Sequence, residues 1–600
     1  MKKIFILLTA FVTFQSFSQL YVSSNSYVYN KGTVVFVNQG INLQTDGNVF
    51  LRNEGQLLQG TAAISTNQGE GEVSVFQEGT SDNYDYNYWS SPVGNASSSI
   101  GNEPFGIAML NKPISLTSST PAIILPMNNQ NGIANPLSIS QRWIYKFLSS
   151  STYSQWFQVG SAATILAGEG FTMKGTSGTD VTDIESDGVL NNPGGNGAQR
   201  YDFRGKPNDG NISVSVDTGK FTLTGNPYPS ALHVNEFLLD ISNAACTGIA
   251  YYWEQDKSVN SHAILAYRGG YGTYSPMGGI LPTDFGIYVP AYFNSYNIDG
   301  TLNTAGLTTA LAIQRKYAPV GQGFMVKGAS NGAILLKNSH REYYKESELY
   351  SQFERSANSS TSSSPSDGMN SLSYLRLNTI IDNANTKQLA LAFATQATDG
   401  VDRGIDALSP VSNDLPDDVY FFLNNDKYVI QVIRFDITKR IPIGIKATDN
   451  TNFKFYIPET VNFDENQMVY LYDAQDGMYH DVKNSTFEIS LSTGIYNNRF
   501  ELTFQGNQLE NSGNIKNDFV IVQNNTTEML TVSNPNLLNV RSVTLFDLTG
   551  KQIFEKEKLV TQEIYQFSTN GLSEAVYLVE LLTADNRKIG QKIIISTARN

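Results

Sequence analysis

The apolar runs of this chain are short and are separated by turn residues at close intervals, and this spacing constrains the fold more than any other feature. Beyond Asp518 seven such runs follow one another, at 519–522, 529–532, 540–546, 552–554, 564–567, 576–582 and 592–595. Runs of that length and spacing predict a small antiparallel β-sandwich. Between the third and fourth runs, Gly550 supplies the positive φ of a tight turn, while Asp547 and Thr549 can hydrogen-bond local backbone.

The region 19–80 repeats the pattern on a smaller scale. Short apolar pieces alternate with glycine-containing turns, which fall at 30–32, 38–40, 46–47 and 53–55. Each piece is too short to bury its own face. The pieces therefore predict either a solenoid-like cap of stacked short strands or a series of hairpins.

The region 81–345 is predicted to be a large β-sandwich region. Tyr84, Tyr86 and Tyr88 alternate with polar residues and Trp89, and this period of two places the tyrosines on one sheet face. The octets 168–175 and 321–328 share glycines, a phenylalanine and a lysine at matching positions. This match suggests a duplicated sandwich unit.

Two polar segments suggest domain boundaries. A serine-rich linker is predicted at 346–370 and a polar linker at 506–517. Strand-like runs over 371–505 predict a further β-sandwich between them, and the best helical candidate is 341–355. The expected fold class is all-β, with several sandwich domains in tandem.

Composition excludes some function classes. The 600 residues are 40% hydrophobic, which is ample for real cores, and their formal net charge is −14. Nucleic-acid binding requires a basic footprint, so we expect no nucleic-acid partner. The one cysteine, Cys246, excludes an intrachain disulfide, and we expect it to be a buried thiol.

The first residues have the pattern of a signal peptide. Two lysines precede an apolar run at 4–14, and small residues, Ser16 and Ser18, stand before Gln19. We expect residues 1–18 to be removed by cleavage after Ser18. The apolar run is far shorter than the ~20 residues of a membrane span, and no other stretch is long and apolar enough to cross a membrane.

Three C-terminal fragments together carry a family resemblance: the turn 546–551, the run 572–579 and the run 588–595. In this order they resemble the type A C-terminal sorting domain of the bacterial type IX secretion system. The resemblance implies an Ig-like sandwich over 518–600 that routes the protein across the outer membrane and is cleaved on arrival. It also implies the type IX translocon and sorting machinery as partners. The corresponding motif residues are Asp547, Leu548, Thr549, Gly550, Lys551 and Tyr577.

The sequence departs from this family at two places. Ala575 stands where the family usually has glycine, and 522–525 replaces its usual Asn-Pro signature. The alternative to a sorting domain is an ordinary terminal Ig-like module.

No motif for catalysis emerges, and we predict no enzyme, no catalytic residue and no cofactor. The sequence 328–332 fits a hydrolase nucleophile elbow around Ser330, but a strand follows where the elbow needs a helix. We interpret it as a hairpin turn. The histidines fall in separate regions, without the spacing of a zinc site: His233, His262, His340 and His480.

Calcium is the one metal that the sequence suggests. Asp183, Glu185 and Asp187 before a glycine resemble the opening of an EF-hand loop, although glycine occupies the closing ligand position, 194. A looser set consists of Asp399, Asp402 and Asp406. Exposed turns with solvated carboxylates are the alternative for both sets.

Aromatic residues on an open sheet face can stack on sugar rings, and Trp89 and Trp156 are the main candidates. Most aromatic side chains serve cores, which is the alternative here. We therefore expect an exported cell-surface or released protein of adhesin or structural-interaction type. The alternative is a carbohydrate-binding protein that recognises a surface glycan, and a hydrolase is a third class without a supporting constellation.

Overall fold

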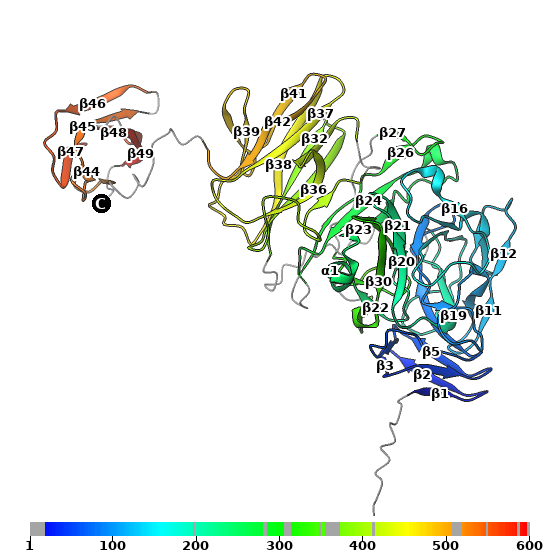
Figure 1. The fold of residues 1–600 in the computed structure, drawn as a ribbon. Helices are drawn as coiled ribbons and strands as arrows, with labels where there is room; N and C mark the ends of the chain where they lie inside the picture. Colours follow the sequence, from blue (N-terminus) through cyan, green and yellow to red (C-terminus); the bar gives the residue numbers. More distant parts are fainter. Residues whose placement is uncertain are drawn as a thin grey trace, which may run out of the picture. The chain divides into compact units, whose positions relative to one another are not determined.

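The computed structural model describes residues 19–195, 198–279, 285–304, 314–346, 350–353, 372–410, 415–506, 519–547, 550–584 and 588–596. Strands dominate, and the described residues contain a single short α-helix, α1 (Val234–Leu239). The all-β prediction is thus confirmed. The chain divides into two compact units, a main body (Met1–Phe504) and a C-terminal module (Gln505–Asn600) (Figure 1).

The main body begins with a parallel β-solenoid. Three strands of the first coil pair in parallel with three of the second: β1 (Leu20–Val22) with β4 (Ile41–Leu43), β2 (Tyr27–Lys31) with β5 (Asn48–Arg52), and β3 (Val34–Val37) with β6 (Gln56–Gln59). Consecutive hairpins would pair neighbouring strands antiparallel, so the solenoid alternative is the correct one. Figure 1 shows β2 and β5 side by side in blue.

The solenoid continues into the next region through one sheet. β5 pairs in parallel with β7 (Glu72–Glu78), and β7 pairs antiparallel with β19 (Arg200–Pro207). The sheet extends through β10 (Leu110–Pro113) and β11 (Ser119–Pro121), while β9 (Val93–Gly94) pairs with β19. The cap and the following region therefore share hydrogen-bonded strands.

A second seven-stranded sheet forms the centre of the main body. It consists of β21 (Phe221–Gly225), β29 (Gly323–Gly328), β23 (Cys246–Gln255), β24 (Arg268–Ser275), β25 (Ile287–Val289), β26 (Asn294–Tyr296) and β27 (Leu302–Thr304). Cys246 is buried, as expected.

Short strands and turns surround these sheets. The strands are β8 (Tyr86–Trp89), β12 (Ile123–Leu125), β13 (Gly132–Ile133), β14 (Ser138–Ser140), β15 (Tyr145–Lys146), β16 (Phe157–Gln158), β17 (Phe171–Lys174), β18 (Thr176–Ser177), β20 (Ile212–Val216), β22 (Ala231–His233), β28 (Tyr317–Ala318), β30 (Gly332–Leu336) and β31 (Arg341–Glu342). The 3-10 turns are Ile107–Met109, Gln141–Trp143, Tyr153–Gln155, Ile241–Asn243, Ile264–Ala266 and Asn338–His340. The helix predicted at 341–355 is wrong where the structure describes it, because the chain begins there with β31.

Each matching octet forms a strand with a buried phenylalanine. Residues 168–175 contain β17, which pairs with β8, and residues 321–328 contain β29, which pairs with β21 and β23. Phe171 and Phe324 are both fully buried. The duplication itself stays a prediction.

The last part of the main body is an eleven-stranded sheet. Its strands are β32 (Ser373–Ile381), β33 (Asn385–Phe393), β34 (Ala407–Leu408), β35 (Asp418–Leu423), β36 (Asp426–Ile433), β37 (Arg440–Ala447), β38 (Thr451–Val461), β39 (Tyr470–Asp473), β40 (Met478–Asp481), β41 (Phe487–Leu491) and β42 (Gly494–Thr503). Its core is continuous with that of the central sheet: Leu223, Tyr251 and Met325 belong to the same buried cluster as Leu375 and Leu389.

The C-terminal module is a two-sheet sandwich with seven strands, as its seven apolar runs predict. One sheet contains β43 (Val520–Asn524), β44 (Met529–Ser533) and β47 (Ile564–Ser568). The other contains β46 (Gln552–Glu557), β45 (Val540–Asp547), β48 (Ala575–Thr583) and β49 (Lys588–Ile595). Leu530, Val543 and Val579 are among the buried residues of its own core.

No helix in the described part of the chain is long and apolar enough to cross a membrane.

Candidate functional site

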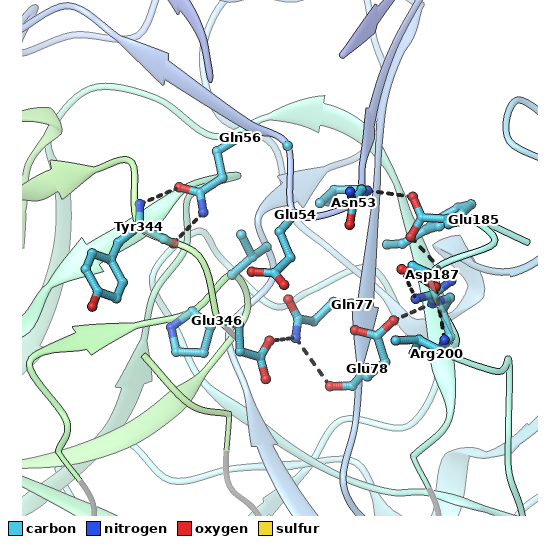
Figure 2. A pocket seen from close by; sticks show the side chains of 16 residues that line it. Asn53, Glu54, Gln56, Gln77, Glu78, Glu185, Asp187, Arg200, Tyr344 and Glu346 are labelled. Atoms are coloured by element: carbon cyan, nitrogen blue, oxygen red, sulfur yellow. Dashed lines mark hydrogen bonds and ion pairs between the residues drawn. The ribbon is translucent and has the colours of Figure 1, made fainter. Parts of the chain in front are cut away.

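An acidic pocket lies where the solenoid meets later segments of the main body (Figure 2). It has a volume of about 70 Å³. The β5–β6 turn, β7, the segment 185–189, β19 and the segment 344–346 all contribute to its lining. The pocket therefore joins residues that are far apart in the sequence.

Five carboxylates line this pocket, together with one guanidinium: Glu54, Glu78, Glu185, Asp187, Glu346 and Arg200. The buried Arg200 forms ion pairs with three of them (Figure 2). Its Nε donates to Glu78 Oε1, its Nη1 lies 3.3 Å from Glu185 Oε2, and its Nη2 lies 3.6 Å from Asp187 Oδ2. Arg200 therefore acts as the internal counter-ion of the pocket.

Glu346 has no ion pair in the described part of the pocket, and its carboxylate accepts hydrogen bonds from neutral donors. Gln77 Nε2 donates to one oxygen at 2.7 Å and the Phe353 amide to the other at 3.1 Å. Burial, and to a lesser degree the charge of Glu78, raise the pKa of Glu346 to about 7. Burial also raises the pKa of Glu185 despite Arg200. The pocket thus takes up a proton near neutral pH.

The first calcium candidates lie partly in this pocket but have separate roles. Asp183 accepts hydrogen bonds from the amides of Asp187 at 3.3 Å and Gly188 at 3.0 Å, which closes a turn. Glu185 and Asp187 face Arg200 instead of a shared ligand position. Among the residues that the structure describes, no group of three or more His, Cys, Asp or Glu side chains could hold a metal ion.

The second acidic set also organises a turn. Asp402 accepts from the Thr398 amide at 2.6 Å, and Asp406 accepts from the amides of Asp402 at 2.7 Å and Val432 at 2.9 Å. Asp399 forms an ion pair with Lys439. Backbone amides and a lysine therefore engage these carboxylates.

The sugar-stacking prediction is wrong for Trp89. Only 1% of this side chain is exposed, and its ring packs against Tyr201, Phe203 and Phe353 with centroid distances of 4.7–5.7 Å. A ring in this position cannot offer a face to a sugar. Both faces of β8 are covered, so the period of two that the tyrosines suggested does not define an open face.

Trp156 is in a different position. It is partly buried against Tyr88 and Phe147, at centroid distances of 5.9 and 4.7 Å. The neighbouring Tyr153 and Phe157 are 49% and 65% exposed. An aromatic surface therefore remains at 153–157.

Sequence reasoning missed a buried lysine beside the tyrosines. Lys174 Nζ lies 4.1 Å from the ring centroid of Trp143, 4.8 Å from Tyr86 and 4.6 Å from Tyr267, and 3.1 Å from His262 Nδ1. Burial lowers the pKa of Lys174 to about 7. The shared lysine of the two octets was the available signal, but its burial depends on contacts from segments far away in the sequence.

The histidines remain scattered through the described structure. His233 caps α1, accepting from the Glu236 amide at 3.1 Å, and His340 Nε2 lies 2.8 Å from Asp240 Oδ2. Ser330 is exposed in the connection from β29 to β30. β29 pairs with β21 and β30 pairs with β20, so these two strands do not form a hairpin and that prediction is wrong. The prediction that a strand follows Ser330 is confirmed.

Within the predicted sorting turn, Gly550 has the positive φ that the sequence predicts. Gly550 adopts φ 83°, its amide donates to Asp547 O at 3.1 Å, and the Lys551 amide donates to Asp547 Oδ1 at 3.0 Å. Tyr577 is buried opposite Asp547, with its hydroxyl donating to Ser573 O at 2.9 Å. Leu548 and Thr549 lie outside the described residues.

Solved structures offer only weak likenesses. A DUF3244 family protein with an immunoglobulin-like β-sandwich fold from Bacteroides vulgatus is 12% identical over 14% of this chain and 93% of its own, with a TM-score of 0.13. Tp47, the 47-kilodalton lipoprotein of Treponema pallidum, is 9% identical over 63% and 92% of the two chains, with a TM-score of 0.12. The BSP domain of a biofilm associated protein is 10% identical over 88% and 96%, with a TM-score of 0.12.

Two family models match in sequence. Residues 508–595 match a domain of unknown function, DUF8694, and residues 125–504 match another, DUF8693. No curated protein matches. Because the second match spans more than half of the chain, this protein belongs to the DUF8693 family.

Proposed function

We propose that this protein is an exported cell-surface or released protein of adhesin or structural-interaction type, with the C-terminal module as its export signal for type IX secretion. The observation that carries the proposal is the independence of that module. It has its own core and its own two sheets, and the glycine turn of the resembling motif lies at its surface. A transferable signal requires a module that folds without its cargo.

The rest of the chain is consistent with an interaction role. The acidic pocket contains an internal counter-ion, Arg200, and its hydrogen bonds join the solenoid to the segments that follow. Such a pocket contributes to the rigidity of the main body. We therefore assign it a structural role and expect no turnover of glycan or peptide substrates.

A transfer experiment tests the export proposal. Residues 507–600 are fused behind a signal peptide and a fluorescent protein, and the fusion is expressed in cells that have a type IX system. We expect fluorescence outside the cells, cleavage within 507–517, and periplasmic retention when the translocon is deleted. Deleting the module from the native chain should trap the main body in the periplasm. Retention of a folded fusion in competent cells would leave the module an ordinary Ig-like domain.

Carbohydrate recognition is the second candidate, and the exposed rings of Tyr153 and Phe157 beside Trp156 favour it. A glycan array probed with the full chain should give hits that weaken at least several-fold in Phe157→Ala. Phe435→Ala removes another exposed ring elsewhere in the main body and is the matched control. Equal binding by both variants, or no hits with the native chain, would reject this candidate.

A further inference from the structure

A lysine and an aspartate contact each other in the interior of the eleven-stranded sheet. Lys387 on β33 donates from Nζ to Oδ1 of Asp418 at the start of β35, and both side chains are 0% exposed. The Val419 amide donates to the same oxygen at 2.9 Å. The buried ring of Tyr292 lies beside this site, with its centroid 5.7 Å from Nζ. The two reactive groups are thus fixed in contact.

This pair differs from the other lysine ion pairs between described residues. Lys112 and Asp180 are 12% and 3% exposed, and Lys337 and Asp240 are 24% and 17% exposed. Those lysine side chains retain contact with solvent. Lys387 and Asp418 form the one lysine pair, among those described, in which both side chains are fully excluded from solvent.

Complete exclusion from water changes the chemistry of such a pair. Nucleophilic attack by the lysine nitrogen requires that its proton first pass to the carboxylate it contacts, and this transfer leaves a neutral amine beside a neutral acid, with no charge left in a medium of low dielectric. The neutral amine has the lone pair that a nucleophile requires. Two groups held in contact also react with a high effective concentration.

We propose that Lys387 and Asp418 condense to an intramolecular amide cross-link. The amine lone pair attacks Cγ of the acid, and a bond forms between Nζ and Cγ. The bond between Cγ and the hydroxyl oxygen then breaks, and that hydroxyl leaves with a proton from nitrogen as water. Nothing is oxidised or reduced, and the reaction requires no co-reactant.

The position of the link suits a structural role. In the sheet, β33 and β35 flank β36 on either side, so the amide joins two strands across a third. The linked residues are 31 positions apart in sequence. The chain cannot form an intrachain disulfide because Cys246 is its one cysteine. The amide thus provides the covalent constraint that disulfides supply in many exported proteins.

Peptide mass spectrometry of the full chain tests the link. After denaturation and cleavage at lysine and arginine, residues 377–403 should remain joined to 404–427, with no cleavage after Lys387 and a mass deficit of one water. An uncut linear peptide 377–427 has the same mass, so fragmentation must show two amino termini. Complete cleavage after Lys146 and Lys337, which also form ion pairs, is the control within the chain. Free peptides 377–387 and 404–427 would overturn the proposal and leave an ion pair.

Variants locate the bond. Asp418→Asn removes the carboxylate that accepts the ammonium proton, so this variant should lack the linked product and yield the free peptides 377–387 and 404–427. Lys387→Met and the doubly apolar Lys387→Met/Asp418→Leu should lack it, and the double variant leaves no buried charge if the single variant fails to fold. Linked peptides in either lysine variant would place the bond elsewhere and overturn the assignment. The test uses protein from the cytoplasm of any host, so its outcome is separate from that of the export proposal.

Discussion

Positive φ angles fix several turns, and the sequence indicates some of them directly. Gly550 has φ 83°, and a Cβ built on it would meet no atom within 4 Å. Its requirement for glycine is therefore conformational and not steric. Asn424 and Asn425, between β35 and β36, also have positive φ, at 50° and 65°, and asparagine tolerates this region better than most residues.

Gly550→Val should destabilise the C-terminal module, because a β-branched residue is strained at positive φ. We expect a loss of about 1–2 kcal/mol in the free energy of unfolding of residues 505–600. Gly550→Asn should lose distinctly less free energy of unfolding, because asparagine tolerates positive φ better than valine does. Urea denaturation of the three modules measures both changes, and equal stability of the valine and asparagine variants would show that the turn does not require this backbone.

The pKa of Glu346 predicts a dependence of stability on pH. Its folded pKa of about 7 exceeds the ordinary value of 4.5, so the folded protein holds a proton that the unfolded chain releases. The proton on Glu346 therefore contributes to the free energy of unfolding. This contribution is fully present below about pH 4.5, decreases as the pH rises from there through 7, and amounts to at most about 3 kcal/mol.

Glu346→Gln replaces the protonated acid by a neutral amide and should remove this dependence. The variant should match the native protein at pH 4.5 and melt at a higher temperature at pH 8. Thermal denaturation at several pH values gives the difference between the two proteins, which cancels the other titrating groups. A constant difference across the range would contradict the assignment.

At the scale of single residues, the sequence predicted where turns lie more reliably than it predicted which side chains are buried. The turn at Gly550 depends on neighbours in sequence, so it could be read directly. Trp89 and Lys174 depend on rings supplied by Phe203, Phe353 and Tyr267, which no local pattern connects to them. The sugar prediction at Trp89 was wrong for this reason.

Among the elements, the solenoid shows that sequence patterns can locate short strands but cannot determine how those strands pair. Short runs and turns marked its strands, but only the pairing of Leu20 with Ile41 and Tyr27 with Asn48 distinguishes coils from hairpins. Both folds bury the same short apolar runs. The sequence is therefore compatible with both alternatives, and the parallel register decides between them.

Arg52 is a further element-scale feature that hydrophobic patterns cannot show. It is fully buried at the end of β5, donating to the carbonyl oxygens of Leu116 at 2.7 Å, Leu51 at 2.8 Å and Ser74 at 2.9 Å. Its guanidinium lies 3.6 Å from the ring centroid of Phe76. One side chain thus ties β5, β7 and the loop before β11 together.

Arg52→Ala should lower the free energy of unfolding by at least about 3 kcal/mol, because the substitution leaves several buried carbonyl groups without their hydrogen-bond donor. Lys31→Ala provides the matched control: Lys31 lies opposite Arg52 in the parallel register but is exposed, and its loss should change stability by less than about 0.5 kcal/mol. Denaturation of the full chain measures both. Similar losses for the two variants would contradict the assigned role of Arg52.

At the scale of the whole molecule, composition indicated the polar segments but did not show whether the regions on either side of each segment pack against each other. Most of the linker predicted at 346–370 lies outside the described residues. Beyond it, Arg403 donates to the carbonyl oxygens of Leu238 at 2.7 Å, Asn243 at 2.7 Å and Cys246 at 2.9 Å. The sandwich expected at 371–505 is thus packed onto the preceding region, and such contacts between distant segments leave no local pattern in the sequence.

The second polar segment, 506–517, differs from the first because the hydrophobic cores before and after it share no residues. Every buried residue of the module core lies between Phe519 and Ile595, and the three other buried clusters end at or before Phe504. Two cores without shared residues should unfold independently. Calorimetry of the full chain should therefore show the module's transition at the same temperature as in residues 505–600 alone.

Removing residues 505–600 should likewise leave the melting temperature of the main body unchanged within about 1 °C, which for a body of this size corresponds to a change of about 1 kcal/mol in the free energy of unfolding. A lowered melting temperature in the truncated chain would reveal stabilising contacts between the units. The fusion experiment would then need a longer segment than 507–600, because an export signal that depends on its own cargo for stability cannot be transferred intact to a fluorescent protein.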